Sequence, residues 1–473
     1  MAEISAHATS HADRRLNGRI TVLNVQEVFL HMEEAEVLFA LRASDGTYYW
    51  DIVRRNVLIG VHGLHGGGFV APALVPPSLV STAKDFVKAE LNRLVRRYVA
   101  GRAPSYIFVT CQRERKGSQL FDAVADPLLD LMGEDAIAVE LVNRTAVSYP
   151  DIVLGRKTRV PPVAVPATAP RDLSEIADRT AVAVHKHFGV SIDARGLVAE
   201  SMAIFVANRD HYRRLFAEHR PKAVVCINNA TLKGLFAAAK EAQVPAFELQ
   251  HGEINRRNPG YSYPKSISSS HPGLAVPTAL LTFAEYWNDV AHFPVRTVSS
   301  IGNDYFHQQR VPGGDGILMI SAYFYHESLR ALALELADFV GQRTIYYKLH
   351  PHQFAEKAAI EQAFRGKSNI VVVSDEPDLP ELLKRCDHVV GVHSTVTYIA
   401  LQAGKKVCLY KRSNYYLHDD IFAYVELFDD ASELREIISA PPGKYFTNQG
   451  PAPMFFQPLD ARRFMQEVER VAS

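Results

Sequence analysis

Three short clusters of polar residues in this sequence could carry out chemistry on a phosphate-bearing substrate. They are Gln250-His251-Gly252-Glu253, Lys348-Leu349-His350-Pro351 and His393-Ser394-Thr395, and each follows an apolar run. Imidazole and carboxylate groups transfer protons, whereas hydroxyl, ammonium and imidazole groups donate hydrogen bonds to phosphate oxygens. The clusters therefore predict proton transfer next to a bound phosphate.

The first cluster supplies the candidates for proton transfer. The apolar run Ala246–Leu249 predicts a strand, and the loop after it contains Gly252, which allows a sharp turn and the close approach of a ligand. We expect His251 to act as a general base, with Glu253 as its orienting partner or substitute, and Gln250 to contact the substrate. The alternative is a histidine that only hydrogen-bonds a loop carbonyl.

The second cluster is a candidate phosphate holder. Pro351 restricts the residue before it to extended conformations, so the direction of the His350 imidazole is fixed. Lys348 adds a positive charge near the end of the same predicted strand, Thr344–Leu349. An ordinary strand end with an exposed turn is the alternative interpretation.

The third cluster combines hydroxyl groups with the start of a helix. A predicted strand over His388–Val392 runs into His393, Ser394 and Thr395, and a helix is predicted over Tyr398–Ala403. Ser394 or Thr395 suits the N-cap, and the free N–H groups at a helix start attract anions such as a diphosphate. Simple capping of the helix by these hydroxyl groups is the alternative.

Strands that alternate with helices position all three clusters at the carboxyl ends of parallel strands, where open α/β sheets bind ligands. The sequence therefore predicts an α/β fold with two domains built on doubly wound parallel sheets. The other strands are predicted over Tyr106–Thr110, Ala136–Leu141, Ala223–Ile227, Ile317–Ser321, Ile370–Val373 and Lys406–Tyr410, and further helices over Ser81–Tyr98, Thr231–Gln243 and Leu459–Val471.

The chain is predicted to divide into three parts. Residues 1–100 form an N-terminal α+β extension, residues 101–310 a first Rossmann-like domain, and residues 311–473 a second one that includes the terminal helix. The second boundary is the Gly- and Pro-rich break Val311–Gly316. The proline-rich run Arg156–Arg171 predicts an exposed surface loop.

Weaker candidates for substrate contact lie outside the three clusters. Arg113 and Arg115 belong to a polar loop after the first strand of the first domain, and Asn228 follows another strand. Tyr261 and Tyr263 offer aromatic faces that suit sugars. A solvated charged loop and a tyrosine-rich surface turn are the respective alternatives.

The composition excludes several classes of function. Lysine and arginine number 52, as do aspartate and glutamate, so no overall charge favours nucleic acid. The four cysteines lack metal-ligand spacing and predict buried thiols in a reducing cytoplasm. No Asp-x-Asp element stands where a metal-diphosphate would need it, so we expect no cofactor and no metal.

The N-terminus lacks the apolar stretch of a secretory signal, which predicts a cytoplasmic protein. Val57–Val80 contains no Asp, Glu, Lys or Arg, but its glycines and prolines would break a membrane-spanning helix. We expect a buried loop there, or a loop that contacts the inner face of the cytoplasmic membrane.

In order and type, Gln250-His251-Gly252, Lys348-Leu349-His350-Pro351 and His393-Ser394-Thr395 resemble motifs of bacterial GT-B transferases of surface polysaccharide assembly. These include sialyl- and polysialyltransferases, capsule Kdo transferases and CDP-glycerol glycerophosphotransferases. The resemblance implies a GT-B-like fold of two Rossmann-type, doubly wound domains with a cleft between them. In this fold the His-Pro and Ser-Thr pairs hold the donor nucleotide and its phosphates. Val298–Asp304 is similar to the domain-linking strand of such enzymes, with Asp304 in place of the usual proline. The paired acidic-acidic-Gly motif of sialyltransferases is not found.

The resemblance implies a glycosyltransferase that moves a sugar from a CMP- or other nucleotide-activated donor to a glycan or lipid-linked glycan acceptor. The first domain would bind the acceptor and the second the donor, in the synthesis of capsule, lipopolysaccharide or exopolysaccharide. The alternatives are transfer of an alditol phosphate from a CDP donor, a UDP-sugar 2-epimerase, and a non-catalytic nucleotide-sugar-binding partner.

Overall fold

A computed structural model of the chain describes residues 25–43, 46–64, 104–110, 114–116, 119–140, 157–159, 173–256, 258–307, 310–322, 325–392, 394–411, 419–441, 443–446 and 452–472. The predicted helix Ser81–Tyr98 and two predicted site residues, Arg113 and His393, lie outside these ranges.

Seven parallel strands form the first sheet, in the order β5-β4-β1-β6-β7-β8-β9. The chain proceeds outward from β1 in both directions, so the sheet is doubly wound, with its topological switch point between β1 and β6. The strands are β1 (Tyr106–Thr110), β4 (Ala136–Glu140), β5 (Lys157–Arg159), β6 (Ala223–Cys226), β7 (Ala246–Leu249), β8 (Ala279–Thr282) and β9 (Thr297–Ser300).

Six parallel strands form the second sheet, in the order β12-β11-β10-β13-β14-β15, with the switch point between β10 and β13. The predicted α/β fold with two doubly wound domains is therefore confirmed. The strands are β10 (Gly316–Ile320), β11 (Ile345–Lys348), β12 (Ile370–Val373), β13 (Cys386–Gly391), β14 (Lys406–Tyr410) and β15 (Glu426–Phe428).

Both sheets are buried on both faces. Successive side chains of a strand point to opposite faces, so each strand contributes to two cores. In β10, for example, Ile317 and Met319 belong to one core and Leu318 to another. The second sheet is covered by α10 (His326–Ala337), α11 (Lys357–Ala363) and α14 (Ala431–Ser439) on one face and by α12 (Leu379–Arg385) and α13 (Thr395–Gln402) on the other. The first is covered by α5 (Asp126–Met132) and α15 (Ala461–Ala472) on one face and by α8 (Ala194–His219) and α9 (Lys233–Glu241) on the other.

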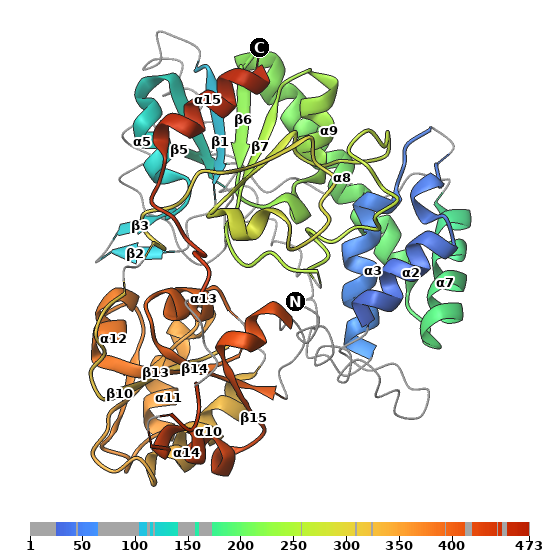
Figure 1. The fold of residues 1–473 in the computed structure, drawn as a ribbon. Coiled ribbons are helices and arrows are strands. Elements are labelled where there is room, and N and C mark those ends of the chain that lie inside the picture. The colour runs from blue at the N-terminus through green and yellow to red at the C-terminus, as the bar shows by residue number, and fades with distance from the viewer. Residues whose placement is uncertain are drawn as a thin grey trace, which may run out of the picture.

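The described residues before the first sheet form helices that lie beside it (Figure 1). Phe29, Trp50 and Phe188 share one core, and they come from α2 (Val25–Ala35), α3 (Trp50–Leu64) and α7 (Ser174–Phe188). The prediction of an α+β extension is wrong for ranges 25–43 and 46–64, whose strand-like feature is one isolated bridge.

The charge-free segment Val57–Val80 begins as a helix and not as the predicted loop. Val57–Leu64 is the second half of α3, and Val57, Leu58 and Val61 are buried in the core. The rest of the segment lies outside the described residues. Among the helices that the structure describes, none has the length and apolar character to cross a membrane.

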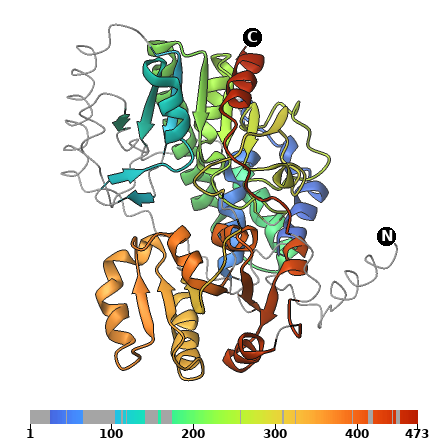
Figure 2. The same ribbon diagram turned by 60° about the vertical axis from the view of Figure 1, so that its left-hand side comes forward.

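The terminal helix α15 packs on the first sheet, although it follows the second domain in the sequence (Figures 1 and 2). Its Phe464 and Val468 pack in one core with Phe108 of β1. The predicted domain 311–473 is corrected accordingly. The amphipathic pattern of Leu459–Val471 predicts a helix, but it does not say which sheet will cover the apolar face.

The chain therefore crosses between the domains twice, and the two crossings lie side by side. The Leu459 N–H donates a hydrogen bond to Asp304 Oδ1 at 2.8 Å. Gly302 has a φ of +79°, and a Cβ there would lie 2.0 Å from the carbonyl oxygen of Pro458, so only glycine fits. Asp304 thus ties the second crossing to the first.

Two predicted loops contain short strands instead. The polar loop after β1 forms an antiparallel hairpin of β2 (Glu114–Lys116) and β3 (Gln119–Phe121). At the start of the predicted loop Arg156–Arg171, Lys157–Arg159 pairs with β4 as the edge strand β5. Strands of three residues are too short to show a hydrophobic period.

Candidate functional site

The carboxyl ends of the strands carry the predicted site residues. In the second sheet β11, β10 and β13 are neighbours, and His350, Ser321 and Ser394 follow them closely. Adjacent strands lie about 4.8 Å apart, so the ends of β11 and β13 are on the order of 10 Å apart. The structure thus brings the second and third clusters to the switch point of this sheet.

The first cluster meets the third across the boundary between the two domains. A Cβ built on Gly252 would lie 3.5 Å from Oγ1 of Thr395, and the Tyr398 hydroxyl donates a hydrogen bond to Oε1 of Glu253 at 3.0 Å. Gly252 and Glu253 follow β7, and Thr395 begins α13, which lies between the two domains in Figure 1. The carboxyl edges of the two sheets therefore face each other at this point.

Glu253 is the acidic group at this junction. The residue as a whole is half-buried, and the burial of its carboxyl group raises the pKa of that group to about 7. Hydrogen bonds from Asn255 Nδ2, at 2.8 Å, and from Tyr398 oppose that shift. His251 lies half-buried on the same loop. A carboxyl group that titrates near neutral pH can accept and release a proton under cellular conditions.

Ser394 occupies the N-cap position of α13 but does not cap it. Its backbone is extended, with φ −168° and ψ 162°, and its side chain makes no capping hydrogen bond. The Oγ atom is buried and has no hydrogen-bond partner in the part of the chain that the structure describes. The alternative of simple capping by Ser394 therefore does not hold, and its hydroxyl can serve a ligand.

His350 is held at the end of β11 through its backbone. Its N–H donates a hydrogen bond to Oε1 of Gln353 at 3.1 Å, and the same oxygen accepts one from Ser321 Oγ at 2.7 Å. The buried Gln353 thus ties the ends of β10 and β11 together. Pro351 begins a 3-10 helix, Pro351–Glu356, directly after His350.

Lys348 does not point to the switch point, contrary to the prediction that it helps to hold phosphate. Its Nζ donates a hydrogen bond to the carbonyl oxygen of Ser374 at 2.9 Å. Ser374 directly follows β12, which lies on the side of β11 that faces away from β13. Burial lowers the pKa of its ammonium group. The predicted strand Thr344–Leu349 gave no indication that the Lys348 side chain would turn toward β12.

Gln250 shapes the loop and does not present its side chain to a substrate, contrary to the prediction that it contacts the substrate. Its side chain is fully buried, donates to the Gly252 carbonyl at 2.9 Å and accepts from the Phe283 N–H at 2.8 Å. These two bonds fix the turn that carries His251 and Glu253.

The predicted acceptor loop with Tyr261 and Tyr263 is a buried segment. The Tyr261 hydroxyl donates to Glu248 Oε1 and that of Tyr263 to Asp51 Oδ1, each at 2.7 Å. Both rings are 3% exposed and cannot stack on a sugar. This prediction and its alternative of a surface turn are wrong, because helix α3, some 200 residues earlier, supplies the partner of Tyr263.

Two weaker candidates are placed only in part. Asn228 is half-buried at the carboxyl end of β6, next to β7, and so shares the edge that carries His251. Arg115 lies in β2, paired with Leu120 of β3.

Three residues that shape the candidate site were missed in the sequence: Tyr398 and Asn255 at the junction, and Gln353 at the ends of β10 and β11. Tyr398 and Asn255 lack a distinguishing local signal. Tyr398 reaches Glu253 only in the folded chain, and Asn255 reaches it only through the turn of their shared loop. Gln353 stands two residues after the His-Pro step, and that position could have drawn attention to it.

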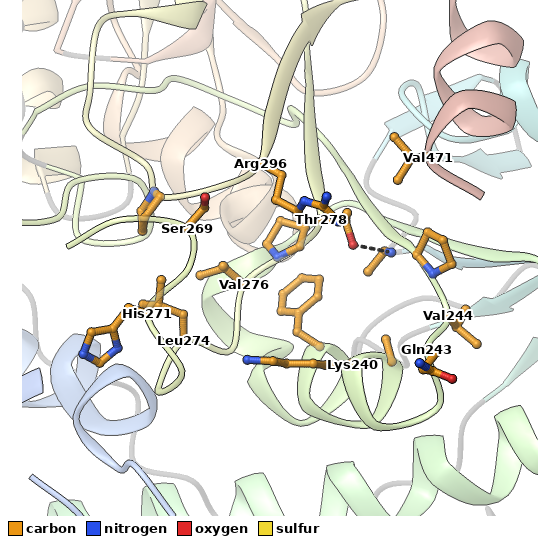
Figure 3. Close-up of a pocket in the computed structure, with 16 residues that line it drawn as sticks. Lys240, Gln243, Val244, Ser269, His271, Leu274, Val276, Thr278, Arg296 and Val471 are labelled. Atoms are coloured by element: carbon orange, nitrogen blue, oxygen red, sulfur yellow. Dashed lines mark hydrogen bonds between the residues drawn. The ribbon is translucent and has the colours of Figure 1, made fainter. Parts of the chain in front are cut away.

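A cavity of about 370 Å³ opens at the opposite, amino end of β7 and β8 (Figure 3). Lys240 and Arg296 lie on opposite sides of it, and Thr278 Oγ1 accepts a hydrogen bond from the Ala246 N–H at 3.1 Å within its wall. It is therefore separate from the junction of Glu253 and α13.

Within the described ranges, no three His, Cys, Asp or Glu side chains come close enough together to hold a metal ion. Cys226, Cys386 and Cys408 are buried free thiols, as predicted, and Cys111 lies outside the described residues.

The chain matches no protein-family model and no curated protein. Solved structures with a similar fold include MurG of Acinetobacter baumannii, at 11% identity and a TM-score of 0.43, which covers 78% of this chain and 100% of that one. A putative UDP-N-acetylglucosamine 2-epimerase of Listeria monocytogenes has 12% identity and a TM-score of 0.48, covering 78% and 96%. The glycosyltransferase VinC, in complex with dTDP, has 16% identity and a TM-score of 0.43, covering 78% and 99%.

Proposed function

We propose that the chain is a GT-B-type glycosyltransferase that transfers a sugar from a nucleotide-activated donor to a glycan acceptor in bacterial surface polysaccharide synthesis. The observation that carries this proposal is the junction of Glu253 with the start of α13, where Tyr398 bonds the carboxylate and Ser394 presents a buried hydroxyl group that has no partner among the described residues. A proton acceptor and an anion-binding helix start face each other there, on two doubly wound domains.

In the proposed reaction the donor phosphate lies at the start of α13, against Ser394 and the backbone N–H groups. The acceptor hydroxyl oxygen forms a bond to the anomeric carbon, and the bond from that carbon to the phosphate oxygen breaks. The electron pair of the broken bond stays on the leaving nucleotide, where N–H and hydroxyl donors stabilise the charge. The hydroxyl proton passes to Glu253. We assign this role to Glu253 rather than to His251 because of its contact with α13 and its pKa of about 7.

A panel of CMP-, CDP-, UDP- and GDP-activated donors tests the proposal. Thermal-shift titration identifies the donor that binds, and transfer is then assayed with glycan and lipid-linked glycan acceptors. Transfer of sugar to an acceptor supports the proposal. Transfer of an alditol phosphate, release of an epimerised sugar without an acceptor, or binding without turnover would instead establish one of the alternatives.

Ser394→Ala is expected to weaken donor binding about tenfold or more, because a hydrogen bond to a charged group contributes roughly 1.5–3 kcal/mol. Isothermal titration calorimetry with the donor identified above measures the change. Ser270→Ala, on an exposed loop near the amino end of β8, is the control and should bind as the natural protein does. Equal affinity in both variants would remove Ser394 from the donor site.

Transfer is expected to be independent of metal, since the proposed donor site neutralises the phosphate charge with a helix start and a hydroxyl group. Turnover should be unchanged after dialysis against EDTA and should not rise when Mg²⁺ or Mn²⁺ is returned. A loss of activity that Mg²⁺ restores would show that a cation takes part.

A further inference from the structure

One helix, α13, contacts both halves of the proposed chemistry. Its first residues, Ser394 and Thr395, lie at the proposed phosphate site, and Tyr398 follows one helical turn later. Residues three and four apart lie on the same face of a helix, so the hydroxyl groups and the tyrosine share one face. Tyr398 then reaches Glu253, 145 residues earlier in the chain and on the other domain.

The Tyr398 ring is fixed in place by the core between the domains. It is 1% exposed, with its centroid 4.8 Å from that of Trp287 and 5.0 Å from that of Phe455. The Trp287 Nε1–H in turn donates to the Phe455 carbonyl at 2.6 Å. A tyrosine held by such packing has little rotational freedom, so its hydroxyl position follows the position of α13.

The two hydrogen bonds on Glu253 leave one carboxylate oxygen open. Asn255 Nδ2 and the Tyr398 hydroxyl both donate to Oε1, whereas Oε2 accepts no hydrogen bond from the described residues. Oε2 is therefore the oxygen that can take a proton from an acceptor hydroxyl group.

We propose, on the basis of the proposed function, that Tyr398 is a positioning residue that aims the Glu253 carboxylate at the acceptor hydroxyl group, from the same helix, α13, whose start binds the donor phosphate. The donor phosphate lies at the start of the helix, and the same helix holds the proton-accepting group one turn away. The carboxylate is thus in position when the donor is in place. Asn255 holds the Glu253 carboxylate from its own loop, and Tyr398 holds it from the second domain.

The hydrogen bond from Tyr398 also favours the ionised form of Glu253, because it donates to a carboxylate. Burial is the main cause that raises the pKa, and no charged side chain of the described residues is among its causes. His251 and Arg256 belong to the same loop as Glu253 and Tyr398 belongs to α13, while Arg257 and His393 lie outside the described residues. Removal of the Tyr398 hydroxyl should therefore raise the pKa of Glu253 further.

The test is Tyr398→Phe, with Tyr286→Phe as the control. The control removes a hydroxyl group from the same aromatic cluster but leaves the hydrogen bond between Tyr398 and Glu253 in place. Tyr398→Phe should lower kcat at pH 7 about tenfold, move the acidic limb of the pH profile upward by about one pH unit, and leave donor affinity within twofold. Tyr286→Phe should change none of these. In a Glu253→Gln background, Tyr398→Phe should have no further effect on kcat.

A second readout does not depend on activity. Carboxyl ¹³C NMR titration should give a higher pKa for Glu253 in Tyr398→Phe than in the natural protein. An unchanged Glu253 titration, or a loss of donor affinity with an unchanged pH profile, would overturn the positioning role. If the titration shifts while no donor supports transfer, the contact between Tyr398 and Glu253 stands and the proposed function fails.

Discussion

Glu253→Gln is expected to lower kcat by about two to four orders of magnitude, the range that general-base assistance contributes. Gln keeps the shape of the side chain and can still accept a hydrogen bond from Tyr398, but it cannot take a proton. In the natural protein activity should rise with pH through about 7, since the base must be ionised and its pKa is about 7. The variant should lack this rise. Steady-state kinetics between pH 5.5 and 9, with donor binding measured in parallel, give the result.

Glu248→Gln is the matched control for this experiment. Glu248 lies on the same strand and loop segment, and burial also raises its pKa to about 7, but its side chain is fully buried and bonded to Tyr261. Its substitution should leave the rise of activity near pH 7 in place. If Glu248→Gln abolished that rise and Glu253→Gln kept it, the base would have been assigned to the wrong carboxyl group.

Arg54→Met is expected to lower the free energy of unfolding by about 3–5 kcal/mol, because it removes the only positive charge bonded to a buried carboxylate in the described residues and leaves that carboxylate with one hydrogen bond, from Trp50. Arg54 is 1% exposed and donates to both carboxylate oxygens of Glu33, at 2.7 and 2.9 Å. It also donates to the carbonyl oxygens of Pro259 and Ser262, at 2.6 and 2.9 Å, in the segment that follows Glu253. Denaturant unfolding at fixed pH measures the loss.

The pH dependence of this variant has a definite sign. Burial already raises the pKa of Glu33, and Arg54 opposes that shift, so the substitution raises the pKa further. A group with a raised folded-state pKa favours folding when protonated, and this contribution is lost as pH rises. The loss of stability should therefore be smaller at pH 5 than at pH 8.

Two further variants complete this experiment. Arg195→Met removes an exposed partner of Asp178 and should cost about 0–1 kcal/mol. Glu33→Leu with Arg54→Met removes both buried charges and should be less destabilised than Arg54→Met alone. A double variant as unstable as the single one would mean that the bonds to Pro259 and Ser262 dominate.

Local pattern was enough to predict the strands that carry the site. Ala246–Leu249 is a strand with the predicted bounds, and the predicted strands Thr344–Leu349 and His388–Val392 differ from β11 and β13 by one or two residues at each end, because short apolar runs between polar turns have few other ways to fold. The polar residues after these strands could then be placed at a sheet edge by topology. The meeting of Glu253 with α13 could not, since it depends on the orientation of two domains.

The errors have the same origin. Tyr261 and Tyr263 looked like surface residues because their partners, Glu248 and Asp51, satisfy the hydroxyl groups only in the folded chain. Likewise, the charge of Lys348 gave no sign that its ammonium group would bond a backbone carbonyl beyond β12. Buried polar groups need partners, and sequence distance conceals where those partners are.

The paired crossings at Gly302 and Pro458 restrict the mechanical freedom of the two domains. Bodies joined by a single linker can swing and twist in many directions, whereas two linkers fastened side by side leave rotation about their shared line as the soft motion. The bond between Asp304 and Leu459 does the fastening. The start of α13 and Tyr398 are thereby held in one register relative to Glu253.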